Sequence, residues 1–358
     1  MVDFFLVNYF TANRLQNIVS TINASSPTAN IYIIDNSNND VEYDFLNKIS
    51  GFNTKIFHAR SNIGFGAACN ILYEKSNSEY IFLLNPDIHL NVDCIPTMLL
   101  LMQNNPRIAA CSPKQYWDSS LEWLLPPAWL PTGIDEWALT YANYNRNYQE
   151  KLSFAYQNLS KNLWLNPGKF IFQKALSGSA LLIRRSVAQK VGGLFDSNFF
   201  MYYEDSDLCL RLRNSGLSMA ISTESYIIHD FIHNENKIRM MEESKLMYFE
   251  KHFNHNGQWK KRLQKLNDAK YDFYMFDFKP LPTTSHHMKI PNQLANEEWF
   301  CEISPSPLLI PSITKLGKGP ILWIDFANIK KLLGNLNVYM RISKLNFDRN
   351  YKSHYFIF

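Results

Sequence analysis

The sequence lacks the marks of an exported, zinc-binding or membrane-spanning protein. None of its five cysteines lies in a Cys-x-x-Cys motif, so neither a zinc site nor a disulfide framework is indicated. We therefore expect the protein to lie in a reducing compartment. The N-terminus has no basic stretch followed by an apolar run, and no window reaches about 18 uninterrupted apolar residues. We therefore expect a cytoplasmic protein with neither a signal peptide nor a membrane span.

The sequence also has little excess of positive over negative charge. The formal net charge is +4 at pH 7, and no block of Lys or Arg stands out. This argues against a nucleic-acid partner, whereas a weak attraction to anionic lipid headgroups stays open. The chain has 358 residues, of which 46% are hydrophobic. That length exceeds what one core usually supports, so we expect a main domain and a smaller unit.

The first hundred residues alternate short apolar runs with segments of helical spacing. We expect strands at 4–7, 31–34, 55–58 and 80–84, and helices at 13–23, 41–50 and 66–75. This alternation is typical of βαβ units and predicts an α/β fold with a mostly parallel sheet. Such sheets bind ligands at the carboxyl ends of their strands, so the loops after these strands are the expected site.

The rest of the chain changes character twice. Residues 115–174 hold five of the eight tryptophans and are expected to form an aromatic-rich insertion or lid within a domain that spans 1–253. We expect a strand at 219–222 and a helix at 237–252. Residues 254–358 are expected to form a helical linker and a small β-rich module. Its predicted elements are a helix at 259–270 and strands at 299–303, 320–326, 337–342 and 355–358.

Two acidic turns are candidates for chemistry. Asp87, in the turn Asn85-Pro86-Asp87 after an apolar strand, offers a carboxylate for a divalent cation, although an Asx turn that ends a strand is the favoured explanation of this turn taken alone. Glu204 and Asp205 precede an amphipathic helix. One of them is a candidate general base, and the competing explanation is a helix N-cap.

Three further positions have weaker signals. Asp35 follows an apolar strand and offers hydrogen-bond acceptors to a base or ribose, with turn chemistry as the alternative. Gly64, after Asn62, lets the backbone approach a ligand closely, but it is not part of a complete phosphate-binding motif. His229 ends an apolar run and is a candidate metal ligand or a structural histidine. Asp207 and Arg211 are spaced for a helix-surface pair.

Six sequence blocks occur in a fixed order along residues 3–253. A strand followed by Asn8-Tyr9 leads to IIDNSNND, SNIGFGAACN, FLLNPD, SGSALLIRR and GGLFDSNFFMYYEDSDLCLRLRNSG. In this order they resemble the family 2 glycosyltransferases, especially the bacterial rhamnosyltransferase-like branch. The resemblance implies a GT-A fold, a nucleotide-diphosphate sugar donor, Mg²⁺ or Mn²⁺, and inversion at the anomeric carbon.

The resemblance also implies roles for individual residues. Tyr9, Asp35, Asn62 and Gly64 match nucleotide-contacting positions, although Phe10 departs from the asparagine usual after the tyrosine. Asn85 and Asp87 match the ends of the metal-binding DxD motif, with asparagine in place of the first aspartate. Asp205 matches the catalytic base with Glu204 beside it, and His229 matches a histidine that completes the metal shell.

The function implied is sugar transfer in bacterial surface polysaccharide synthesis, O-antigen or capsule. The expected donor is a dTDP-, UDP- or GDP-linked hexose, with rhamnose and galactofuranose among the candidates. The expected acceptor is a glycan or lipid-linked glycan, reached at the inner face of the cytoplasmic membrane by a peripheral protein. One alternative is a catalytically inactive glycan-binding protein on a transferase fold. A nucleotidyltransferase is the other, but the segment VNYFTANR lacks the glycine-rich loop it requires.

Overall fold

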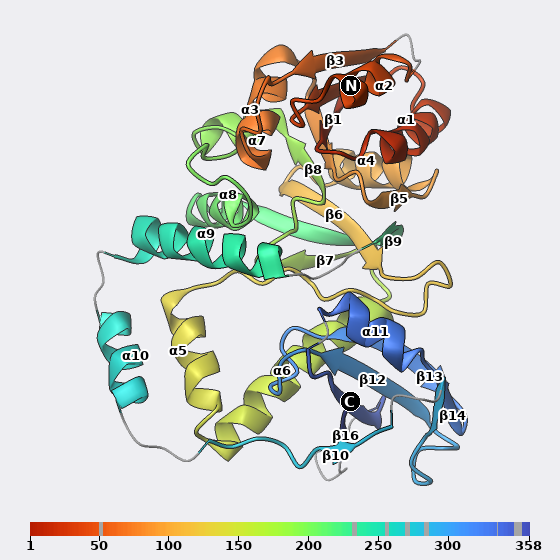
Figure 1. The fold of residues 1–358 in the computed structure, drawn as a ribbon, viewed down its shortest axis with the longest axis vertical. Helices are drawn as coiled ribbons and strands as arrows, with labels where there is room; N and C mark the ends of the chain where they lie inside the picture. The colour runs from red at the N-terminus through yellow and green to blue at the C-terminus, as the bar shows by residue number, and fades with distance from the viewer. Residues whose placement is uncertain are drawn as a thin grey trace.

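A mixed β-sheet dominates the N-terminal half of the protein (Figure 1). The computed structural model describes residues 1–49, 53–230, 235–254, 258–268, 273–282, 286–334, 336–346 and 353–358. The sheet has nine strands in the order β3-β2-β1-β4-β8-β6-β9-β5, with β7 paired to β9 off this path. They are β1 (Val2–Asn8), β2 (Asn30–Asp35), β3 (Thr54–His58), β4 (Tyr80–Leu84), β5 (Ile88–Leu90), β6 (Ile108–Tyr116), β7 (Phe170–Gln173), β8 (Ala180–Arg184) and β9 (Ser218–His229).

The pairing directions refine the expected mostly parallel sheet. Strands β3, β2, β1 and β4 are parallel, as βαβ connections require, but β8 runs antiparallel to both β4 and β6. The α/β class expected from the sequence is confirmed, with a mixed sheet. The carboxyl ends of β1, β2 and β4 therefore share one edge, which is where the first sequence blocks end.

Helices cover both faces of this sheet, which explains why its central strands are apolar throughout. Every residue of β1 and β4 is buried. Phe4 packs with residues of α1 and α4 on one face, and Phe5 packs with residues of α3 and α8 on the other. The covering helices are α1 (Ala12–Ser25), α2 (Asp40–Asn47), α3 (Phe65–Lys75), α4 (Cys94–Asn104), α7 (Arg185–Lys190), α8 (Glu204–Asn214) and α9 (Glu235–Phe253).

The tryptophan-rich segment contains two helices that the sequence did not predict. Thr132 and Asp135 form a capping box at the start of α5 (Gly133–Ala142), and Asn145 caps α6 (Arg146–Leu165). All five tryptophans of the segment are buried or half-buried. Trp123 is 8% exposed and packs into the core of the C-terminal part of the chain.

The C-terminal part contains a five-stranded sheet and a two-stranded sheet among its described residues. The order of the larger sheet is β10-β16-β15-β12-β13, and β11 pairs with β14. The expected strand at 320–326 is shorter, because a helix begins at Phe326. The elements are α10 (Gln258–Asp268), β10 (Lys279–Pro280), β11 (His287–Lys289), β12 (Glu298–Ser304), β13 (Ile313–Lys318), β14 (Ile321–Trp323), α11 (Phe326–Leu332), β15 (Tyr339–Lys344) and β16 (His354–Ile357).

Helix α6 joins the C-terminal sheet although more than a hundred residues separate them (Figure 1). Arg341 on β15 and Glu302 on β12 form a fully buried ion pair, and the Nε of Arg341 lies 2.5 Å from Oε2 of Glu302. Gln157 on α6 donates to the same carboxylate at 2.6 Å, and Ser153 accepts from Arg341 at 2.8 Å. This network holds α6 and the C-terminal sheet together. The expected division at residue 253 stays a prediction.

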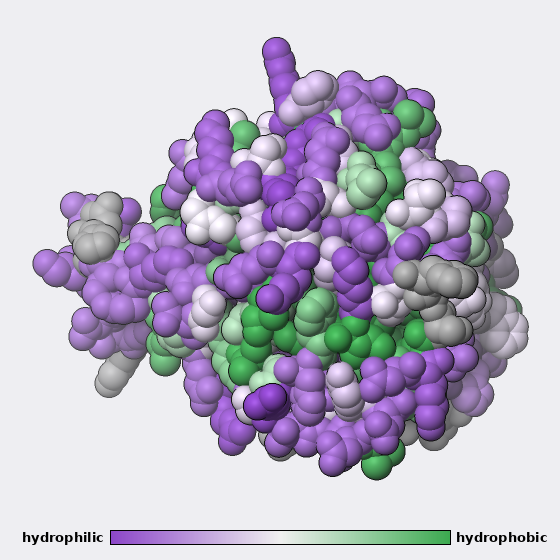
Figure 2. Space-filling view, turned by 90° about the horizontal axis from the view of Figure 1, so that it is seen from above, coloured by the Kyte–Doolittle hydropathy of each residue, from purple (hydrophilic) through white to green (hydrophobic). Residues whose placement is uncertain are grey.

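One face of the molecule shows how polar and apolar side chains are distributed on it. Seen from the end where β3 and α2 lie, it is mostly hydrophilic, with one apolar strip across it (Figure 2). None of the helices in the described part of the chain is both long and apolar enough to cross a bilayer.

Candidate active site

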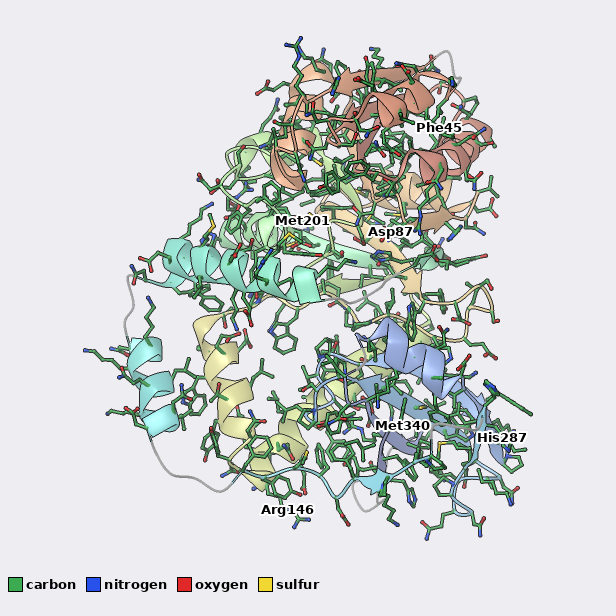
Figure 3. All side chains as sticks on the ribbon, viewed as in Figure 1. Phe45, Asp87, Arg146, Met201, His287 and Met340 are labelled. Atoms are coloured by element: carbon green, nitrogen blue, oxygen red, sulfur yellow. The ribbon has the colours of Figure 1, made fainter. Side chains whose placement is uncertain are left out.

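A cavity of about 630 Å³ lies between the N-terminal sheet and the C-terminal sheet. Its walls differ in chemistry. The N-terminal sheet and α8 contribute carboxyl, amide and imidazole groups, whereas residues 124–129 and the C-terminal part contribute almost only hydrocarbon. Asp87 and Met201, both in the cavity wall, lie along the lower edge of the N-terminal half, while Met340 and His287 lie in the C-terminal half (Figure 3).

Asp87 and His229 meet because of strand pairing. Asp87 directly precedes β5, and Ile88 on β5 is the register partner of His229 on β9. The Nε2 atom of His229 lies 3.4 Å from Oδ1 of Asp87, and this oxygen is buried with no hydrogen-bond partner. Burial alone raises the pKa of Asp87, but a hydrogen bond and the charge from a protonated His229 outweigh burial and hold that pKa below its usual value.

Gln115 orients His229. Gln115 lies on β6, which runs parallel to β9 and places Gln115 opposite Ile227. Its Nε2 donates to Oγ of Ser179 at 3.1 Å, so its Oε1 faces Nδ1 of His229 at 3.0 Å. An amide oxygen only accepts hydrogen bonds, so Nδ1 carries a proton, and in the neutral imidazole Nε2 presents a lone pair toward Asp87.

This arrangement fits a bound cation. A carboxylate oxygen and an imidazole lone pair that face each other without an intervening proton repel, and a metal ion between such groups removes the conflict. Within the described residues, no three His, Cys, Asp or Glu side chains form a complete metal cluster. Asp87 and His229 could therefore supply two ligands, and a substrate with oxygen donors would have to supply the rest.

Asp205 is positioned by backbone groups rather than by a capping role. The N–H of Gly178 donates to Oδ2 of Asp205 at 3.0 Å, and the N–H of Ser206 donates to Oδ1 at 2.7 Å. Helix α8 is preceded by Tyr203 in a left-handed conformation with φ of 64°, and no side chain caps it. The N-cap explanation for the acidic turn is therefore wrong. Burial raises the pKa of Asp205, and these hydrogen bonds offset only part of that effect.

Glu204 is the more deeply buried carboxyl group, with 6% exposure. Its Cβ packs 3.6 Å from the position a Cβ would take on Gly66, and its Oε2 is buried without a hydrogen-bond partner. Burial, reinforced by the charge of Asp205, raises the pKa of Glu204. Two adjacent carboxyl groups thus line one cavity, and one of them has an unused polar atom.

Asp207 belongs to the support of this turn and not to the helix surface. It pairs with Arg211 at 2.8 Å as expected, but its side chain is fully buried, so the expectation of a surface pair was wrong. Lys251 and His252 on α9 also bind its carboxylate, at 2.6 and 2.7 Å. Arg211 in turn donates to backbone carbonyls at residues 191, 193 and 194. Asp207 therefore fixes α8 against α9 and the preceding loop.

The expected nucleotide residues form a neighbouring cluster outside the cavity wall. Oδ1 of Asp35 accepts from Asn8 and Ser37, and its Oδ2 is buried without a hydrogen bond, 3.9 Å from Nε2 of His58. Oδ1 of Asn62 accepts from the N–H of Gly64 at 3.0 Å. Tyr9 is 51% exposed. Tyr9, Asp35, Asn62 and Gly64 do not line the cavity, whereas Asn85, Asp87, Glu204, Asp205 and His229 do.

Gly64 links the two groups of residues. Its φ is +85°, and a Cβ at this position would lie 2.3 Å from the carbonyl oxygen of Phe200. The N–H of Phe65 donates to that same oxygen at 2.9 Å. The loop after β3 is thereby bonded directly to the turn that leads into Glu204 and Asp205.

Sequence reasoning missed the residues that hold these groups. Gln115 belongs to no sequence motif, although it lies on β6, so no signal marked it. Ser177, Gly178 and Ser179 were part of a recognised block, but they received no role. Asn8 and Asn36 bind Asp35 and Asn62, at 2.8 and 2.9 Å, and only their place after β1 and β2 hinted at this.

Comparison with known proteins identifies the N-terminal region. Residues 4–161 match the model of the glycosyl transferase family 2. The chain carries a family 2 glycosyltransferase domain. The resemblance to this family is thus confirmed for these residues, as is the enzyme class, glycosyltransferase. The match includes Asp35 and Asp87 and ends before Glu204, Asp205 and His229.

The relatives of this chain are distant in sequence. It is 24% identical to rhamnosyltransferase WbbL of Escherichia coli K12 over 249 residues, 66% of this chain and 86% of that protein. It is 35% identical over 92 residues to the N-acetylglucosaminyl-diphospho-decaprenol L-rhamnosyltransferase of Mycobacterium tuberculosis, 25% of this chain and 30% of that one. A Pyrobaculum calidifontis mannosyltransferase solved with GDP-Man and Mn²⁺ superposes with a TM-score of 0.47 at 10% identity, over 76% of this chain and 65% of that one.

Proposed function

We propose that this glycosyltransferase moves a hexosyl group from a nucleotide-diphosphate donor to a hydroxyl of a glycan or lipid-linked glycan acceptor, with inversion, in bacterial surface polysaccharide synthesis. One observation carries the proposal: Asp87 with His229, and Glu204 with Asp205, line the same cavity. The names of the relatives support rhamnose as the transferred sugar. The proposed donor is a dTDP-, UDP- or GDP-linked sugar.

Asp205 is the proposed general base. Its carboxylate takes the proton of the acceptor hydroxyl as the acceptor oxygen bonds to the anomeric carbon and the bond to the diphosphate breaks. The N–H groups of Gly178 and Ser206 hold the carboxylate in place. Its raised pKa makes it a stronger base at neutral pH than an exposed aspartate. Glu204, beside it, presents its unpartnered Oε2 for a hydrogen bond to a substrate.

Asp87 and His229 are the proposed ligands of Mg²⁺ or Mn²⁺. The cation, when bound, stabilises negative charge on the departing nucleoside diphosphate. Asp35, with its unpartnered Oδ2, is the proposed acceptor for the ribose or base, and Tyr9, Asn62 and Gly64 form the adjoining nucleotide loops. Asn85 lies between these loops and the cavity.

The test measures release of nucleoside diphosphate from UDP-, dTDP- and GDP-sugars with Mn²⁺ or Mg²⁺. We expect release by the wild type and a loss of roughly 10²- to 10⁴-fold in Asp205→Asn, because the general base is removed. Binding of Mn²⁺ with UDP, dTDP or GDP should change less than about twofold, because these ligands contact Asp87 and not Asp205.

Asp93→Asn is the matched control, since Asp93 is exposed and its side chain caps nothing. Normal activity of Asp205→Asn would remove the proposed base. A wild-type protein that binds glycan but never releases nucleoside diphosphate would instead support the inactive, glycan-binding alternative.

A further inference from the structure

The proposed reaction leaves one side of the cavity without a role. Residues 124–129 all line it, and they include two leucines, two prolines and one tryptophan. The C-terminal part adds Ile303, Pro305, Pro311, Ile313 and Leu333. None of these side chains except that of Trp129 has a polar atom. Catalysis at Asp205 does not need this second wall.

The apolar wall is a fixed surface. Leu124 and Thr314 exchange two backbone hydrogen bonds, at 2.8 and 2.9 Å, which join the loop to β13. Nε1 of Trp164 on α6 donates to Oγ1 of Thr314 at 3.0 Å. Lys315 pairs with Glu122 at 2.5 Å and lies over the ring of Trp123. These contacts bond the loop and the C-terminal sheet into one continuous surface.

The chemistry of this wall selects its ligand. A sugar ring that entered here would lose the water around its hydroxyl groups and find almost no hydrogen-bond partners, which is unfavourable. A hydrocarbon chain loses nothing by leaving water and gains contact with the leucine, isoleucine and proline side chains. Sugars have suitable partners only on the other side of the same cavity, around Asp87, Gln115 and Asp205.

We propose that residues 124–129 and the C-terminal sheet form a binding site for the hydrocarbon part of the acceptor. The acceptor is then a lipid-linked glycan. Its lipid lies against this wall while its reacting hydroxyl faces Asp205. The position of that hydroxyl rests on the proposed function, whereas the hydrocarbon site rests on the apolar wall alone. The volume of about 630 Å³ accommodates the first units of a long chain and not the whole of it.

A chain-length series tests the proposal. Calorimetric titration of the full-length protein with alkyl β-glucosides, from methyl to octyl and below their micellar concentrations, gives affinity against chain length. We expect a gain of about fourfold for each added methylene, followed by a plateau once the cavity is filled. Ala128→Trp should remove this gain, because the half-buried Ala128 lines the cavity and a large side chain there occupies it.

Ala155→Trp is the matched control, since Ala155 is exposed on α6 and lies outside the cavity wall, and it should keep the gain. Pro305→Asp provides a second variant, which places a charge in the wall and should weaken octyl more than methyl glucoside. Equal affinities along the wild-type series, or a gain that survives in both wall variants, would overturn the proposal.

Titration of the same proteins with Mn²⁺ and UDP, dTDP or GDP separates the hydrocarbon site from the proposed function. A wild type that binds no nucleotide but keeps the chain-length gain would contradict the proposed function and leave the hydrocarbon site standing.

Discussion

At the scale of single residues, the orientation of His229 is the clearest determinant of the candidate metal site. Its Nε2 faces Asp87, and its Nδ1 is hydrogen-bonded to Oε1 of Gln115. The bond at Nδ1 fixes the orientation of the ring and so the direction in which Nε2 points. Gln115 is itself held by Ser179. The amide of Gln115 thus sets the orientation of the imidazole of His229. Gln115 is a positioning residue and is not proposed to contact a substrate.

Gln115→Leu should weaken binding of Mn²⁺ in the presence of UDP by about 10- to 100-fold, because the hydrogen bond that orients His229 is lost. Gln115→Glu should retain most of the affinity, since a carboxylate also accepts from Nδ1. Electron paramagnetic resonance of free Mn²⁺ measures both. Gln16→Leu, an exposed change on α1, is the control. Equal Mn²⁺ affinities in the Leu and Glu variants would show that Gln115 does not position the ligand.

At the scale of elements, the start of α8 is held in place from several sides. Tyr202 and Tyr203 both have positive φ, 69° and 64°, which non-glycine residues rarely adopt. Two hydrogen bonds stabilise the turn. The backbone N–H of Phe65 donates to the carbonyl of Phe200, and the hydroxyl of Ser244 donates to the carbonyl of Met201 at 2.6 Å. The two carboxyl groups follow immediately, so their position depends on α3, α8 and α9 together.

Asp207 makes this part of the fold sensitive to acid. Burial raises its pKa, but hydrogen bonds from His252 and Lys251 and the pairing with Arg211 outweigh burial and hold the pKa well below its usual value. Its contribution to stability is present above the unfolded pKa of about 4 and is lost as pH falls toward the lower folded value.

We therefore expect Asp207→Asn to reduce the free energy of unfolding by about 3 kcal/mol at pH 6, because the partner charges lose their carboxylate. The reduction should shrink steadily below pH 4, because the unfolded wild type binds a proton there that the folded protein does not yet bind. Urea unfolding of both proteins between pH 6 and pH 2.5 measures the difference. A loss that does not depend on pH in this range would show that Asp207 acts by shape and not by charge.

At the scale of the whole molecule, the cavity exists because two distant parts of the chain meet across it. The N-terminal sheet supplies its polar wall, and the C-terminal sheet supplies the apolar one. Helix α6 bridges them through Gln157, which binds Glu302 at 2.6 Å within a network that includes Arg341. The C-terminal sheet is therefore part of the candidate active site.

The buried pair of Arg341 and Glu302 should show the asymmetry expected of ions in a core. Arg341→Met alone leaves an uncompensated buried carboxylate and should cost about 3 to 5 kcal/mol. The double variant Arg341→Met with Glu302→Leu should be more stable than the single one, since no buried charge remains. Urea unfolding at pH 7 compares the three proteins. A single variant as stable as the wild type would show that the pair does not fasten α6 to the sheet.

Much of the N-terminal half was predictable because its information is local. The apolar runs of β1 to β4 and the helical spacing of α1 and α3 are properties of short segments, and the observed bounds differ from the predicted ones by a few residues. Asp87 and Asp205 were identifiable for the same reason, since each stands in a short block directly after a strand or before a helix. Helix α6 was not predicted, because it lies within the tryptophan-rich segment, whose composition indicated an insertion or lid.

The alternation of strands and helices, the acidic turns and the family resemblance all follow from residues that are close in the sequence. The partnership of Gln115 with His229, 114 residues apart, follows from the pairing of β6 with β9 and has no local signature. The burial of Asp207, the link from Gly64 to Phe200 and the apolar wall of the cavity are likewise set by which elements pack together. Packing depends on the whole chain at once, because a side chain contacts what the fold brings to it.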